Sequence, residues 1–152
     1  MKQITQQLSQ IISDYAEKLM GISENDLAAK PDPLKWSRKE ILGHLIDSAQ
    51  SNIRRFVVAQ YEEAPFIIYN QDKWVAISDY QNYPTTDLIS LWILLNKHIC
   101  IILGNTSEES LLRMCKTNKD IPHTIKWLAE DYIRHLLHHL HQVCNLEPVP
   151  YT

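Results

Sequence analysis

The stretch IPHTIKWLAEDYIRHLLHHLHQV, residues 121–143, holds five of the chain's seven histidines and predicts one long amphipathic helix. At about 100° per residue, apolar side chains recur along one arc of this helix. The arc consists of Ile125, Leu128, Ala129, Tyr132, Ile133, Leu136, Leu137, Leu140 and Val143. A helix with such a stripe is stable only when other elements cover it, so the sequence predicts a fold of packed helices.

The histidines of this helix divide between two faces. His139 falls inside the apolar arc and His135 about 20° beyond its edge, whereas His138 and His141 project outward and are expected to face solvent. Two imidazoles one helical turn apart can converge on a single metal ion. The alternative is a merely polar helix whose inward pair is hydrogen-bonded in the core without a metal.

Three more amphipathic helices are predicted, over residues 3–20, 38–61 and from Pro84 to about Gly104. Ser37 and Glu40 have the spacing of a capping box at the start of the second of these. Residues 62–83 form a long crossover in which DKWVAIS is a candidate short helix, and residues 105–120 form a polar link. The sequence therefore predicts an all-α fold, a four-helix bundle of one domain over residues 1–152, with the long crossover between helices 2 and 3.

A third histidine completes a candidate metal site. His44 projects about 60° outside the apolar arc of the second long helix, which suits either a surface histidine or one that lines an open bundle mouth. Together with His135 and His139 it would give three imidazole ligands and open coordination positions, as in catalytic zinc sites. Imidazole also suits nickel, copper or iron, so the ligands do not select the metal. A di-iron site is disfavoured because no glutamate has a histidine three residues later.

Two aspartates are candidates for orienting these ligands. Asp47 follows His44 by three residues, and Asp131 precedes His135 by one turn. A carboxylate that accepts the far N–H of a ligating imidazole fixes its tautomer. The alternative is that both aspartates are solvated residues of the helix surface.

Composition excludes several classes of protein. A net charge of −3 without a Lys/Arg block gives no reason to expect nucleic acid as a partner. The apolar runs are shorter than a membrane span, and the N-terminus lacks the apolar core of a signal peptide. Three cysteines without CxxC spacing indicate reduced thiols, and we therefore expect a cytoplasmic location.

The segments KWSRKEILGHLIDSAQSNIRRF, YNQDKWVAISDYQ and DYIRHLLHHLHQV, in this order, resemble the DinB-like (DinB/YfiT) superfamily of bacterial metalloenzymes. The resemblance implies an up-down-down-up bundle, often dimeric, whose metal-binding histidines fall on His44, His135 and His139. Gln142 matches the family's glutamine three positions after the last ligand. His141 departs from the family, which frequently has glycine at that position.

Characterised members of the family include transferases that use low-molecular-weight thiols and a thiol-dependent isomerase. The resemblance therefore implies a divalent-metal-dependent enzyme (Zn, Ni or Fe) that transfers such a thiol to a small electrophile, and a homodimer. Trp36, Tyr69 and Trp74 are candidates for the pocket wall, or else plain core residues. The alternatives are a non-catalytic metal- or ligand-binding bundle of the stress response and a metal-assisted hydrolase.

Overall fold

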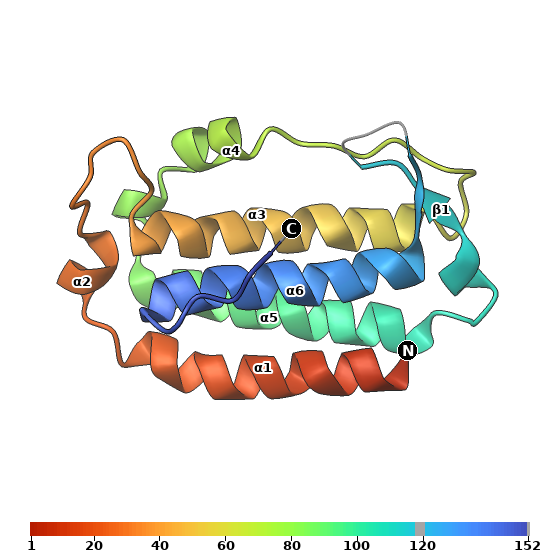
Figure 1. The fold of residues 1–152 in the computed structure, drawn as a ribbon, viewed down its shortest axis with the longest axis horizontal. Coiled ribbons are helices and arrows are strands. Elements are labelled where there is room, and N and C mark those ends of the chain that lie inside the picture. Colours follow the sequence, from red (N-terminus) through yellow and green to blue (C-terminus); the bar gives the residue numbers. More distant parts are fainter. Residues whose placement is uncertain (118–120, 152) are drawn as a thin grey trace.

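Four long helices lie side by side along most of the molecule (Figure 1). The computed structural model describes residues 1–117 and 121–151. The long helices are α1 (Lys2–Met20), α3 (Arg38–Val58), α5 (Thr85–Asn105) and α6 (Ile125–Cys144). The predicted all-α four-helix bundle is therefore confirmed.

The directions of the four helices define the topology. In Figure 1, α1 and α6 run one way and α3 and α5 run the other, which is the expected up-down-down-up order. α5 packs between α1 and α3, and α6 closes the bundle on the other side of the same two helices. The long crossover from α3 to α5 lies outside the bundle and contains the predicted short helix as α4 (Gln71–Ser78), followed by a 3-10 turn at Tyr80–Asn82.

The starts of α3 and α6 show why each helix begins where it does. The Ser37 hydroxyl accepts from the Glu40 amide at 3.0 Å, and the Glu40 carboxylate accepts from the Ser37 amide at 2.7 Å, so the predicted capping box is present. Helix α3 ends at Val58, three residues earlier than predicted. Helix α6 begins at Ile125 rather than Ile121, because the Thr124 hydroxyl caps the Trp127 amide at 3.1 Å.

A short pair of strands and a short helix were not predicted. The segment between α5 and α6 carries a small antiparallel pair, β1 (Met114–Cys115) with β2 (His123–Thr124), instead of only the polar link predicted for residues 105–120. Residues 118–120 of that link lie outside the described part of the chain. Helix α2 (Glu24–Ala28) interrupts the connector between α1 and α3.

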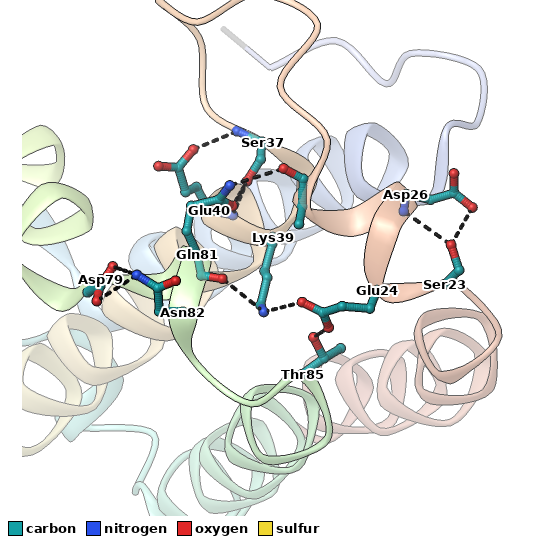
Figure 2. Close-up of polar contacts among 11 residues, drawn as sticks. Ser23, Glu24, Asp26, Ser37, Lys39, Glu40, Asp79, Gln81, Asn82 and Thr85 are labelled. Atoms are coloured by element: carbon teal, nitrogen blue, oxygen red, sulfur yellow. Dashed lines mark hydrogen bonds and ion pairs between the residues drawn. The ribbon is translucent and has the colours of Figure 1, made fainter.

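A buried lysine joins three segments at the end of the bundle where α3 begins (Figure 2). The Lys39 ammonium donates to Glu24 Oε1 at 2.6 Å and to the Gln81 carbonyl at 3.2 Å. Glu24 also accepts from the Thr85 hydroxyl at the start of α5. This network anchors α2, the end of the crossover and the start of α5 against α3.

A glycine of α3 allows the crossover to pack closely on the helix. The Tyr80 ring lies so close to Gly43 that a Cβ there would sit 2.1 Å from a ring carbon. Tyr80 is buried and donates its hydroxyl hydrogen to Asp47, one turn further along α3. The glycine of the sequence G-H-L is therefore needed for this contact, directly beside His44.

Helix α5 is, within the described residues, the one helix long and apolar enough to cross a membrane by length and composition. It contacts α1 and α3 along the bundle. A core helix of a helical bundle has the same composition, so this feature alone carries little weight. All three cysteines are free thiols, as predicted.

Candidate metal centre

Two helices bring three histidines together. His44 comes from α3, and His135 and His139 come from consecutive turns of α6. One ligand nitrogen from each can be chosen so that all three lie within 4.8 Å of one another. The rings pack in pairs with centroids 4.6–5.1 Å apart. The three predicted residues therefore form one cluster.

The spacing suits a single ion. The Nε2 atoms of His44 and His135 lie 3.1 Å apart. Two ligands of a tetrahedral ion with metal–nitrogen bonds of 2.0–2.1 Å are about 3.3 Å apart. Two imidazole lone pairs this close repel unless a proton or a cation lies between them. The donor set and its geometry thus fit a divalent ion.

Burial keeps the three rings in the protonation state that a metal needs. The His44 side chain is only 1% exposed, and burial lowers its pKa to about 4, with a smaller effect from His139. Burial lowers the pKa of His135 to about 2, and it also lowers the pKa of His139. The three rings are therefore neutral at neutral pH, which is the protonation state in which an imidazole can bind a metal. The interpretation of His44 as a surface histidine is wrong, because its ring is buried against Trp36 and the two histidines of α6.

Hydrogen bonds orient two of the three rings. Nδ1–H of His139 donates to Gln142 Oε1 at 2.7 Å, which leaves Nε2 free as a ligand atom. Nδ1 of His135 lies 3.5 Å from the Ser48 hydroxyl. Nδ1 of His44 is buried and has no hydrogen-bond partner among the described residues.

Neither predicted aspartate orients a ligand. Asp47 accepts from Tyr80 instead of from His44. Asp131 binds Arg134 at 3.0 Å and the Tyr151 hydroxyl at 3.1 Å instead of His135. The helical spacing was compatible with these contacts, but both carboxylates have other partners.

The C-terminal tail folds back along α6 and covers the other two histidines of the cluster's helix. His138 Nδ1–H donates to the Val149 carbonyl, and His141 Nδ1–H donates to the Glu147 carbonyl, each at 2.6 Å. Both side chains are half-buried, so the prediction that they face solvent is wrong. His138 Nε2 also accepts from the Gln142 amide at 3.0 Å. Gln142 therefore links His138 to His139 of the three-histidine cluster.

A cavity of about 370 Å³ adjoins the histidines, and His135 forms part of its wall. Its other polar wall residues include Ser48, Asn52, Arg55, Tyr69, Gln71, Thr117, His123, Asp131 and Tyr151. Tyr69 was a predicted wall residue, and Trp74 packs against it on the outside, with ring centroids 5.2 Å apart. Trp36 contacts the cluster instead, with its ring 5.2 Å from that of His44.

Sequence reasoning missed most of these wall residues, among them Arg55, His123 and Tyr151. Arg55 lies on the same face of α3 as Ser48, a signal that was available in the helical spacing. His123 lines the cavity because it belongs to the short strand before α6 and not to the helix itself. Pro122 and the capping residue Thr124 could have indicated this later start of the helix. Tyr151 depends on the tail turning back at Asn145, which has the left-handed φ of 53°.

Comparisons with known proteins agree with this architecture. The structure superposes on YfiT from Bacillus subtilis, described as "a probable metal-dependent hydrolase with an unusual four-helix bundle topology", with a TM-score of 0.86 and 18% identity over 95% of this chain and 83% of that one. It also superposes on a mycothiol-dependent maleylpyruvate isomerase, with a TM-score of 0.76 and 14% identity over 91% of this chain and 58% of that one. At these identities the likeness shows the fold.

A sequence relative has a related name. A protein of Oceanobacillus iheyensis named "Putative metal-dependent hydrolase" is 30% identical over 112 residues, which are 73% of this chain and 64% of the relative. The match thus spans less than two thirds of that protein. The profile of the DinB superfamily matches residues 7–143, nearly the whole bundle. The chain belongs to the DinB superfamily.

Proposed function

We propose that the chain is a divalent-metal-dependent enzyme whose ion is held by His44, His135 and His139, and that it transfers a low-molecular-weight thiol to a small electrophile. One observation carries this proposal: three neutral, converging imidazoles beside a cavity with a largely polar wall. Among the described residues, no cysteine or carboxylate joins the group as a fourth ligand. The coordination sphere of an ion there would be completed from the cavity.

The residues have separate roles in this reaction. Gln142 and Ser48 hold the rings of His139 and His135 so that their Nε2 atoms point at one place. A divalent ion held there would lower the pKa of a coordinated thiol or water and so supply a nucleophile at neutral pH. In thiol transfer the sulfur forms a bond to an electrophilic carbon, the carbon–oxygen bond of an epoxide or the carbon–halogen bond of a haloarene breaks, and the thiol proton leaves with the alkoxide or to solvent.

Metal-assisted hydrolysis is the second candidate, because the Oceanobacillus relative and YfiT are both described as metal-dependent hydrolases. Hydrolysis needs a general base near the nucleophilic water. Asp131 lines the cavity, but both of its oxygens are engaged. His123 is the remaining candidate base, and its ring stacks on Trp127 with centroids 3.8 Å apart.

The two reactions can be separated with two variants. We expect metal-dependent, thiol-dependent loss of an epoxide or haloarene that disappears in His139→Ala and persists in His123→Ala. Hydrolysis predicts product without added thiol and a large loss of rate in His123→Ala. The control is His98→Ala, because His98 is exposed on α5. If metal-loaded protein turns over neither kind of substrate, and no thiol perturbs the spectrum of bound Co²⁺, a non-catalytic binding bundle replaces both candidates.

The proposal also includes the setting of the protein. We propose a homodimer, because the outer faces of α1 and α5 carry few charges, and a cytoplasmic location, because the thiols are free. The proposed partners are a small-molecule substrate and a second copy of the chain, and not nucleic acid or a membrane.

A further inference from the structure

The cavity beside the histidines contains a buried positive charge. The Arg55 side chain on α3 lines the cavity and is only 9% exposed. Its Nε and Nη2 donate to the Ile67 carbonyl at 3.2 and 3.1 Å, and its Nη1 donates to Asn52 Oδ1 at 3.4 Å. Each of these acceptors is a neutral oxygen, so the contacts satisfy hydrogen bonds without balancing the charge.

No acid forms an ion pair with this guanidinium within the described residues. No described carboxylate lies within 4.0 Å of Arg55. Asp131 lines the same cavity, but it binds Arg134 and Tyr151. A guanidinium has five N–H donors, and the three contacts leave one on Nη1 and one on Nη2. Burial lowers the pKa of Arg55 from its usual value, as expected for a charge removed from water.

A line of polar contacts connects Arg55 with the histidines. The Ser48 hydroxyl lies 3.5 Å from His135, and Asn52 donates to the Ser48 carbonyl at 2.9 Å. Asn52 in turn accepts from Arg55. These residues follow one face of α3, so Arg55 lies about 10 Å further along the helix axis than Ser48. A ligand in the cavity can therefore reach the histidines with one end and Arg55 with the other.

We propose that the cavity binds a small molecule through a carboxylate that pairs with Arg55, while its other end reaches the three-histidine centre. This substrate class rests on the proposed function. A singly charged, planar carboxylate matches the single guanidinium of the described wall and accepts two parallel N–H bonds. A dianionic phosphate fits less well, because Asp131 adds a negative charge to the same wall. The carboxylate belongs either to the thiol or to the electrophile.

The test compares ligands that differ only in this group. Mercaptohexanoate and mercaptohexanol have the same terminal thiol and similar length, and only the first has a carboxylate. Each is titrated into Co²⁺-loaded protein, and the thiolate-to-cobalt absorption reports binding. Hexanoate and hexanol, which lack the thiol, are titrated by calorimetry with and without metal. The variants are Arg55→Gln, Arg55→Lys and the matched control Arg54→Gln, whose arginine is the exposed neighbour.

We expect mercaptohexanoate to bind the wild type at least about tenfold more tightly than mercaptohexanol, since a charged hydrogen bond contributes that much. Arg55→Gln should remove the preference, and Arg54→Gln should retain it. Arg55→Lys keeps the positive charge but lacks the planar guanidinium that donates two parallel N–H bonds. It should therefore retain a smaller preference for the carboxylate. If Arg55→Gln does not fold because the contact with the Ile67 carbonyl is lost, Arg55→Lys becomes the decisive variant. Mercaptohexanol should give the same spectrum with every folded variant.

Each other result has a definite meaning. Equal binding of the acid and the alcohol by the wild type overturns the proposal, as does a full preference in Arg55→Gln or Arg55→Lys. The carboxylate belongs to the electrophile if hexanoate binds at the same time as mercaptohexanol, and binds the wild type but not Arg55→Gln. A preference seen only with the thiols assigns it to the thiol. If neither thiol changes the cobalt spectrum, thiol transfer fails, and Arg55-dependent binding of hexanoate alone then decides whether the carboxylate subsite exists.

Discussion

The Nε2 atoms of His44 and His135 lie 3.1 Å apart although the two residues come from different helices and stand 91 positions apart in the sequence. We expect purified protein to hold about one divalent ion per chain, because this contact and His139 make one preorganised site. Alanine at any of these three positions should abolish tight binding, measured by metal analysis after dialysis. Alanine at His138 or His141, whose Nδ1 atoms bind tail carbonyls, should not. An empty site in His141→Ala with a full one in His135→Ala would contradict the assignment.

The contact between Gln142 and His139 predicts a graded effect. Gln142→Leu removes the acceptor at 2.7 Å from His139 Nδ1 and frees the ring to rotate. Loss of such an orienting partner typically weakens metal binding about 10–100-fold. Competition with a chelator of known affinity would measure this, with exposed Lys126→Ala on the same helix as the control. Unchanged affinity in Gln142→Leu would show that packing alone orients His139.

Helical periodicity was sufficient to predict the long helices and the inward turn of His135 and His139, because both are local properties of α6. It could not predict the burial of His44, which depends on how α3 packs against α6 and on Trp36 from the connector before α3. Nor could it place His138 and His141, because the tail that binds them turns back at Asn145. The cavity likewise combines α3, α6, the crossover and the tail. Local patterns therefore singled out the histidines that cluster, and long-range packing determined what surrounds them.

The outer face of α5 predicts self-association. Leu94 and Ile101 are spaced two turns apart and are 63% and 61% exposed. Apolar side chains gathered on one exposed face favour an interface, so we expect a dimer by light scattering at micromolar concentration. The double change Leu94→Lys and Ile101→Lys should give a monomer. Leu34→Lys, at an exposed apolar residue outside the long helices, is the control and should leave the dimer intact. A monomeric wild type would remove this prediction.

The buried histidines predict that metal-free protein loses stability in mild acid. Folding lowers the pKa of His44 from 6.5 to about 4 and that of His135 to about 2. The unfolded chain therefore binds more protons below pH 6.5, and the free energy of unfolding falls as the pH is lowered. Asp47 works in the opposite direction, because burial raises its pKa from 3.8 to about 6 and the folded state then binds the extra proton.

Two histidines outweigh one aspartate, so we expect a net loss of about 2 kcal/mol between pH 7.5 and 5.5. Urea unfolding of dialysed protein at several pH values would measure it. His44→Gln should reduce the loss by about two thirds, because one histidine and the opposing aspartate then remain. A free energy of unfolding that stays constant or rises toward pH 5.5 would mean that the rings are already protonated in the folded protein.

Two glycines in long helices predict opposite effects of the same substitution. A Cβ at Gly43 would sit 2.1 Å from the Tyr80 ring, whereas a Cβ at Gly104 would meet nothing within 4 Å. Neither glycine has a positive φ, so the difference comes from packing alone. Gly43→Ala should force the Tyr80 ring away from α3 and cost about 1–3 kcal/mol of stability.

Gly104→Ala should instead be neutral or stabilise the protein by up to about 1 kcal/mol, because alanine restricts the unfolded chain and favours the helix. Thermal and urea unfolding of both variants would give the two values. Displacement of Tyr80 also breaks its hydrogen bond to Asp47, which lies one turn from His44 on α3. Gly43→Ala should therefore weaken metal binding as well, and Gly104→Ala should not. Equal stability of the two variants would mean that the crossover is not held against α3 by this contact.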